Sequence, residues 1–262
     1  MNHLTASSCC SWLYAIAVLL AGCSTIPTHT SNKPREDTVT LGGYSTRFQD
    51  GDEHRNHNIT LATGRLDGTT IAPGATFSFN QTVGNRTAEA GYQIARTLSV
   101  TGDEPALGGG VCQVSSTLFN ALLLADLELI ERNAHSRPVH YVPPGRDATV
   151  SYGAKDLIFR NPHPFPVHIR GTVAGNRLTF LVTGPESLPY EVQLVTEDAE
   201  DASPRRVMEV VGTTQSRPDH WKLRAIYVKL YRIRVSSGVP FGKERISNTL
   251  VLTGLDRDEV RP

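Results

Sequence analysis

Apolar residues recur at helical spacing in two segments of the chain. In QVSSTLFNALLLA, residues 113–125, they are separated by three or four positions, which predicts an amphipathic helix. Asp126 follows this segment and is expected to cap it in the left-handed conformation, which aspartate tolerates better than most residues. A shorter helix is predicted over Asn56–Leu66, where nearby glycines end the pattern.

Alternating and short apolar stretches predict strands elsewhere in the chain. Apolar and charged residues alternate in Leu127–Arg132, which indicates a half-buried strand. Gly68–Phe79 predicts a strand, a Pro-Gly turn and a second strand, with Phe77 and Phe79 on one buried face because side chains alternate along a strand. Val150–Gly184 resolves into short apolar segments between turns, which indicates antiparallel sheet.

The remaining residues, 185–262, are expected to form a small β-rich extension. Its strand-like segments are Tyr190–Val195, Val207–Gly212 and Leu223–Val235. A polar acidic segment, Glu197–Pro204, is expected to link two of them, and the pattern leaves open whether they form an appendage or extend the preceding sheet. Together these patterns predict an α+β fold, mostly antiparallel β-sheet, with a helix that carries a cysteine at its amino terminus.

The amino terminus has the pattern of a targeting segment. Its apolar run, Trp12–Leu20, is too short to span a bilayer but suits the core of a signal peptide. The run ends in Leu20-Ala21-Gly22-Cys23, which resembles the bacterial lipobox, so residues 1–22 are expected to be removed and Cys23 acylated. The alternative is an ordinary signal peptide that ends near a cysteine, and the absence of Lys and Arg from residues 1–22 departs from the usual pattern.

Export and acylation would place the protein on the extracytoplasmic face of a membrane. Residues 23–40 are polar and contain two prolines, which predicts a flexible tether between the lipid and a domain over 41–184. Ser24 after the cysteine favours the periplasmic side of the outer membrane in a cell with two membranes. The membrane is therefore an expected partner, through the amino-terminal lipid.

Composition and charge exclude several classes of function. The 26 basic and 26 acidic residues balance, and the basic clusters are short, so no nucleic-acid partner is expected. No CxxC, HExxH or phosphate-loop sequence is present, and His54 and His57 alone do not make a metal site. We therefore expect no metal and no cofactor.

Cys112 lies apart from the three amino-terminal cysteines, Cys9, Cys10 and Cys23. If cleavage and acylation occur at Cys23, Cys112 has no partner for an intramolecular disulfide. It follows Gly108–Gly110 at the start of the predicted helix, where unpaired N–H groups and the helix dipole lower the pKa of a thiol. This position indicates a nucleophile; the alternatives are a buried cysteine used in packing and a glycine run that only forms a turn.

A thiolate nucleophile needs a base, and His135 is the first histidine after Cys112 in the sequence. The helix carries the chain away from Cys112, and a strand over Leu127–Asn133 that runs back along it would bring His135 close to the thiol. Asp147 could then orient the imidazole as the third member of the set. His140 is the rival base.

The same helix start offers groups that could bind a substrate. Gly109 and Gly110 would let a peptide chain lie close to the backbone. The helix N–H groups, together with the hydroxyls of Ser115 and Ser116, could receive an oxyanion during acyl transfer.

Five long motifs between residues 41 and 184 resemble the VanW family of bacterial cell-envelope proteins. They are LGGYSTRF, NHNITLA, PGATFSFNQTVGNRTAEAGY, GGGVCQVSSTLFNALLLADLELIERNAHSRPVHYVPPGRDATVSYG and DLIFRNPHPFPVHI. The family takes its name from vancomycin-resistance clusters, and some members resemble peptidoglycan L,D-transpeptidases that use the motif cysteine. The resemblance implies catalytic roles for Cys112, His135 and Asp147, and substrate contacts for other residues of the motifs. These are Gly109, Gly110, Gln113, Ser115, Ser116, Ser136, Tyr141 and Arg146.

The resemblance implies a reaction on peptidoglycan stem peptides. Cys112 would attack the carbonyl of the third stem residue, expel the terminal D-alanine and pass the acyl group to a neighbouring amine, with His135 as the base. Two alternatives stay open: transfer to water, which would make a carboxypeptidase, and a non-catalytic domain that binds or scaffolds the wall in glycopeptide resistance.

Overall fold

The computed structural model describes residues 38–49, 51–98, 103–135, 137–201 and 223–254. Several predicted features lie outside this part of the chain. They are the expected signal segment and lipobox, nearly all of the expected tether, the strand expected over Val207–Gly212 and the predicted site residue Ser136. Within it, no helix combines the length and apolar character needed to cross a bilayer.

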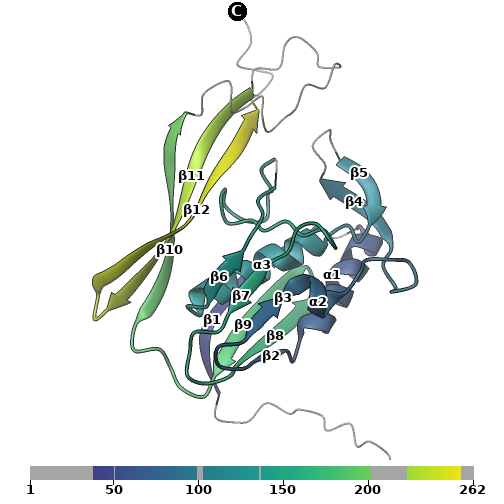
Figure 1. Ribbon diagram of the computed structural model, residues 1–262. Helices are drawn as coiled ribbons and strands as arrows, with labels where there is room; N and C mark the ends of the chain where they lie inside the picture. Colours follow the sequence, from purple (N-terminus) through teal and green to yellow (C-terminus); the bar gives the residue numbers. More distant parts are fainter. Residues whose placement is uncertain (1–37, 50, 99–102, 136, 202–222, 255–262) are drawn as a thin grey trace, which may run out of the picture. The chain divides into compact units, whose positions relative to one another are not determined.

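Three helices and twelve strands make up the described fold (Figure 1). The helices are α1 (Glu53–Leu66), α2 (Phe79–Val83) and α3 (Val111–Leu124). The first six strands are β1 (Val39–Arg47), β2 (Thr70–Ile71), β3 (Thr76–Ser78), β4 (Ile94–Leu98), β5 (Asp103–Leu107) and β6 (Glu128–Glu131). The others are β7 (Ile158–Arg160), β8 (Val167–Ala174), β9 (Arg177–Gly184), β10 (Glu191–Asp201), β11 (Leu223–Ser236) and β12 (Val239–Gly254). All strand pairs among the described residues are antiparallel, which confirms the predicted α+β class.

The largest sheet in strand number has the order β1-β9-β8-β2. Every second residue of β9 is buried, including Phe180 and Val182, and so are Val167 and Ile169 at the start of β8, because one face of the sheet packs against helices. Helix α3 contacts β1 and β9, α1 contacts β8, and the two helices contact each other. The core therefore lies between this sheet and the pair α1 and α3.

A second sheet, β3-β7-β6, and a hairpin, β4-β5, complete the region around the helices. Two strands do flank Pro73-Gly74 as predicted, but β2 pairs with β8 whereas β3 pairs with β7, so they join different sheets. Phe77 and Phe79 are both buried as expected. However, Phe79 begins α2, where the Ser78 hydroxyl accepts the Gln81 N–H at 3.0 Å and caps the helix.

Helix α3 matches the predicted helix and is buried on almost every side rather than along one stripe. Asp126 adopts φ 59° after it, so the expected left-handed cap is confirmed. The buried polar side chains of α3 all have hydrogen-bond partners, as burial of polar groups requires. They are Gln113, Ser115, Ser116, Thr117 and Asn120. These bonds fasten β1 and the segment 146–148 to the helix.

The carboxyl-terminal strands form a sheet of their own, β10-β11-β12, rather than an extension of the first sheet. Figure 1 shows these three long strands side by side. The first part of the acidic segment expected as a link, residues 197–201, belongs to β10, which pairs with β11; residues 202–204 lie outside the described part of the chain. Asp126 fixes the sheet to the end of α3: its carboxylate lies 2.8 Å from Arg234 Nη2 and 3.2 Å from Arg232 Nε.

We expect Gly42→Val to destabilise the fold strongly. A Cβ at Gly42 would meet backbone atoms of α3, at 2.6 Å from the Leu124 carbonyl carbon and 2.7 Å from the Ala121 oxygen. Backbone atoms of a helix cannot move aside to relieve the clash as the end of a flexible side chain can. The free energy of unfolding should therefore fall by about 2 kcal/mol or more. The matched control is Gly64→Ala, in α1, where a Cβ meets nothing within 4 Å. It should gain about 0.5–1 kcal/mol of stability, and equal urea midpoints for the two variants would contradict the prediction.

Candidate active site

Cys112 is the second residue of α3 and its side chain is partly buried. Its sulfur lies 3.5 Å from the Thr149 hydroxyl and 3.7 Å from the Val150 carbonyl oxygen. Gly110, the N-cap of the helix, shows why a glycine is needed here. Its φ is 104°, which favours glycine, and a Cβ on it would lie 2.9 Å from Ile59 Cγ1. The glycine turn thus lets the helix begin with the thiol at its amino end.

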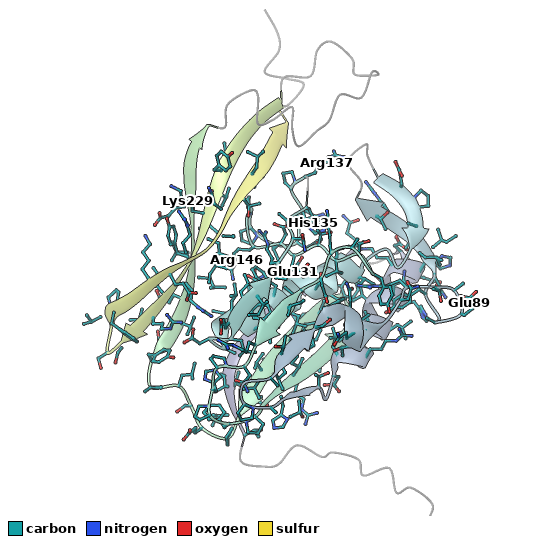
Figure 2. All side chains as sticks on the ribbon, in the orientation of Figure 1. Glu89, Glu131, His135, Arg137, Arg146 and Lys229 are labelled. Carbon is teal, nitrogen blue, oxygen red and sulfur yellow. The ribbon has the colours of Figure 1, made fainter. Side chains whose placement is uncertain are left out.

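His135 and Asp147 form a buried pair beside the thiol. The imidazole Nδ1 lies 2.8 Å from Asp147 Oδ2, and the His135 backbone N–H donates to the same oxygen at 2.7 Å. The side chains are 8% and 9% exposed, so solvent screens this pair weakly. His135 lies on the segment after β6, and Figure 2 shows Arg137 two residues further along it. An isolated bridge between Asn133 and Thr149 holds this segment against the one that carries Asp147.

The electrostatics of the three side chains favour a thiolate and an imidazolium. Burial alone would raise the pKa of the Cys112 thiol, but the hydrogen bond and charge of His135 outweigh burial and lower this pKa to about 7. Burial alone would lower the pKa of His135, but its bond to Asp147 and the neighbouring thiolate raise it to about 9. Burial would raise the pKa of Asp147 as well, yet the His135 bond and Arg132 keep it below its usual value. At neutral pH the arrangement thus supplies a nucleophile and a proton donor.

A cleft of about 570 Å³ opens over the thiol. Its lining includes Cys112, His135 and Thr149, together with Arg55 on α1 and Arg96 on β4. It is large enough for a peptide-sized ligand, and its arginines suit a ligand that carries carboxylates.

The backbone at the start of α3 can receive an oxyanion. The Val111 N–H bonds to the Gly108 oxygen and the Gln113 N–H to the Gly110 oxygen, whereas the Cys112 N–H has no backbone acceptor in the described part of the chain. Among the described residues, no backbone acceptor competes for the Cys112 N–H, which lies beside the sulfur at the positive end of the helix dipole.

The structure places several of the predicted binding residues in the cleft and others away from it. Gly110, Gln113, Tyr141 and the rival base His140 line the cleft, although the Gln113 amide is already bonded to Thr46, Arg47 and Arg55. The predicted residues that are not among its lining are Gly109, Ser115, Ser116 and Arg146. Ser136 lies outside the described residues.

The two serines have a different task from the one expected. Ser115 and Ser116 are fully buried, and their hydroxyls donate to the Ala148 carbonyl at 2.6 and 3.2 Å. The Ser116 oxygen also accepts the Ala148 N–H at 2.9 Å. They therefore fasten the residue after Asp147 to α3 instead of facing an oxyanion, because the helix turns both side chains away from the cleft.

Gly109 and Arg146, the other two predicted residues that do not line the cleft, contribute to packing. A Cβ on Gly109 would lie 2.6 Å from the Ala95 oxygen, so this glycine permits close contact with β4. Arg146 (Figure 2) donates from Nε to the Asn120 side chain at 2.7 Å and stacks over Tyr44.

Thr149 and Arg132 contact the site but are missed by the sequence analysis. Thr149 touches the sulfur, and Arg132 Nη2 donates to Asp147 Oδ1 at 2.8 Å. Neither residue belongs to a sequence motif that indicates a functional site. An isolated threonine, or a charged residue in an alternating strand, ordinarily has a structural role. No group of three or more potential ligands that could hold a metal is found among the described residues.

We expect the alkylation rate of Cys112 by iodoacetamide to rise through pH about 7 rather than 9. Only the thiolate reacts, and a thiol whose pKa is lowered is ionised at every pH above that lowered value. The rate is followed by mass spectrometry of the peptide that contains Cys112, because the sequence has three other cysteines. A midpoint at pH 9 would contradict the thiolate–imidazolium pair.

Comparison with known proteins identifies the family. A family model described as VanW like protein matches residues 54–183. The chain is 41% identical over 169 residues to the uncharacterized protein YoaR of Bacillus subtilis (strain 168), covering 59% of this chain and 56% of YoaR. It is 35% identical over 114 residues to the vancomycin B-type resistance protein VanW of Enterococcus faecalis (strain ATCC 700802 / V583), covering 42% of each.

The chain thus spans about half the length of the curated relatives it matches, and no solved structure matches it. The matched residues include the three side chains of the candidate site, Cys112, His135 and Asp147. The resemblance inferred from the motifs is therefore confirmed, and the chain carries a VanW family domain.

Proposed function

We propose that this protein catalyses thiol-dependent acyl transfer on peptidoglycan stem peptides, with Cys112 as nucleophile, His135 as acid and base, and Asp147 as the group that orients His135. The observation that carries the proposal is the Asp147–His135 bond of 2.8 Å beside a thiol whose pKa is lowered to about 7 in an open cleft. A cysteine used only for packing needs neither a charged partner nor access to a cleft.

In the first half-reaction the Cys112 thiolate attacks the carbonyl carbon of the third stem residue and a C–S bond forms. The oxyanion that develops accepts a hydrogen bond from the Cys112 backbone N–H. The His135 imidazolium donates its proton to the amine of the terminal D-alanine as the C–N bond breaks. D-alanine leaves, and a thioester remains on Cys112.

In the second half-reaction an amine of a neighbouring stem attacks the thioester. His135, now neutral, takes the proton of the amine, and the thiolate is expelled as the new amide forms. The product is a cross-link made from a tetrapeptide, and Cys112 and His135 return to their starting charges. Such a cross-link does not need the D-Ala-D-Ala terminus that vancomycin binds.

Two observations support the choice of substrate. The E. faecalis relative is a vancomycin B-type resistance protein, and vancomycin binds the D-Ala-D-Ala end of stem peptides. Arg55 and Arg96 line the cleft and suit the carboxylates of a stem peptide. We further propose that the protein acts in the cell envelope, on the extracytoplasmic face, held to the membrane by a lipid on Cys23, without a nucleic-acid partner or a cofactor.

The test is incubation of the detergent-solubilised full chain with disaccharide tetrapeptides, followed by mass spectrometry of the products and of the protein. Loss of D-alanine, a thioester adduct on Cys112 and the appearance of dimers are the expected results. Tripeptides without dimers would replace transfer by hydrolysis, as in a carboxypeptidase. Intact tetrapeptide together with measurable binding to purified wall would overturn catalysis in favour of a scaffold.

A further inference from the structure

The carboxyl-terminal sheet lies outside the residues that the family model matches, yet it reaches the acid of the candidate site. Thr249, on β12, is buried, and its hydroxyl oxygen accepts a hydrogen bond of 2.7 Å from Arg132 Nη1. Arg132 Nη2 in turn donates to Asp147 Oδ1 at 2.8 Å. One guanidinium therefore joins the sheet to the carboxylate that holds His135.

Arg132 has little freedom in this position. Its side chain is 5% exposed, and two further bonds hold it: Nε donates to the Asp147 carbonyl at 2.6 Å and Nη2 to the Gly145 carbonyl at 3.2 Å, so four of its five N–H groups have acceptors among the described residues. A buried guanidinium requires a partner for each donor, because an unpaired one is costly away from water. Loss of the Thr249 acceptor would thus favour a different orientation of the Arg132 guanidinium.

A second contact fixes the same loop from the same face of the sheet. Val228, on β11, is the cross-strand partner of Thr249, so the two side chains lie on one face. Val228 is 1% exposed, and its Cγ1 lies 3.0 Å from the position that a Cβ on Gly145 would occupy. The sheet thus packs against the turn that precedes Asp147 and also hydrogen-bonds to the arginine that pairs with it.

We infer that Thr249 and Arg132 are positioning residues of the candidate site, through which the β10-β11-β12 sheet orients Asp147 and, through Asp147, His135. The inference rests on the proposed function for its catalytic consequence, but not for its effect on the thiol. His135 and Arg132 lower the pKa of Asp147, and the charge of Asp147 in turn helps to raise the pKa of the nearby Tyr141. A rotation of Asp147 away from His135 removes a bond that keeps the imidazole charged, and the thiolate loses its counter-ion.

The test compares four variants of the full chain: Arg132→Lys and three others that each change one small side-chain group. Thr249→Val keeps the shape of the side chain and removes the acceptor, whereas Thr249→Ser keeps the hydroxyl. Ser247→Ala removes a hydroxyl two residues away on β12 that has no hydrogen-bond partner among the described residues. The readout is the pH midpoint of iodoacetamide alkylation of Cys112, with circular dichroism and a urea midpoint as controls for folding.

We expect Thr249→Val to move the alkylation midpoint from about 7 upward by about one pH unit, which lowers the rate at pH 7 about fivefold. Thr249→Ser and Ser247→Ala should keep the midpoint of the unaltered protein. Arg132→Lys keeps the charge but loses the planar guanidinium that bonds to both Thr249 and Asp147, so it should shift the midpoint in the same direction. An unchanged midpoint in Thr249→Val with a lowered urea midpoint would mean that the bond only anchors the sheet, and would overturn the inference.

The result is separable from the fate of the proposed function. Alkylation needs no turnover, so a shifted midpoint in Thr249→Val supports the positioning role even if the protein releases no D-alanine. Where D-alanine is released, Thr249→Val should lower kcat by about tenfold or more and leave KM nearly unchanged, because the residue acts on orientation and does not touch the substrate. A change in KM alone would contradict a positioning role.

Discussion

Cys112→Ala is expected to abolish release of D-alanine from tetrapeptides, with a loss of at least about 10⁴-fold. The reason is that the proposed first half-reaction forms a C–S bond, and no other thiol lies in the described part of the chain. The measurement is the amount of D-alanine released per protein molecule over time, read together with the mass of the protein. The thioester adduct on the unaltered chain should be absent from the variant.

A matched variant separates loss of the nucleophile from damage to the fold. Thr149→Val alters the hydroxyl that lies 3.5 Å from the sulfur but leaves the thiol in place, so it should retain the adduct. Circular dichroism of Cys112→Ala should equal that of the unaltered chain, since the side chain is small and partly exposed to the cleft. Release of D-alanine by Cys112→Ala at the original rate would exclude the thiol mechanism.

The second large effect is expected from His135→Ala, which should lower the rate of D-alanine release by about 10³-fold. The imidazolium both stabilises the thiolate and donates the proton to the leaving amine, so its removal affects two requirements of the reaction. Burial then dominates the environment of Cys112, and the pKa of the thiol should rise to its ordinary value of 9 or above. The alkylation midpoint measures this change without a substrate.

His140→Ala is the matched control for His135→Ala. His140 lines the same cleft, but its ring is exposed and packs edge-on against Tyr141, at 5.5 Å between ring centroids. The groups that lower the pKa of Cys112 are His135, Val150 and Thr149, so removal of His140 should leave the alkylation midpoint unchanged. The opposite outcome, loss in His140→Ala and retention in His135→Ala, would reassign the base.

The elements next to the site were predictable because their signals are local. The three-to-four spacing in residues 113–125 and the alternation in Leu127–Arg132 are properties of neighbouring residues, and the structure has α3 and β6 there. By contrast, β1 and the β4-β5 hairpin were missed. The segment LGGYSTR has no clean alternation, and β1 forms because it pairs with β9 and packs its glycine against α3.

Side-chain direction was harder to predict than element type. Ser115 and Ser116 stand close to Cys112 in sequence, yet their hydroxyls are buried against Ala148, because successive helical residues point in different directions. Thr149 and Arg132 stand far from Cys112 in sequence and were missed for the opposite reason. Their contacts with the sulfur and with Asp147 exist only after the 145–150 segment is fastened to α3.

The sequence by itself determined that a cysteine follows three glycines at the start of a helix and that a strand leads from this helix toward a histidine. Those features depend on backbone conformation and residue period, which act over a few neighbouring residues. Only the tertiary structure decided that His135, Asp147, Arg132 and Thr249 form one continuous set of contacts. Hydrogen bonds act over about 3 Å, and only packing of segments far apart in the chain brings such groups within that range.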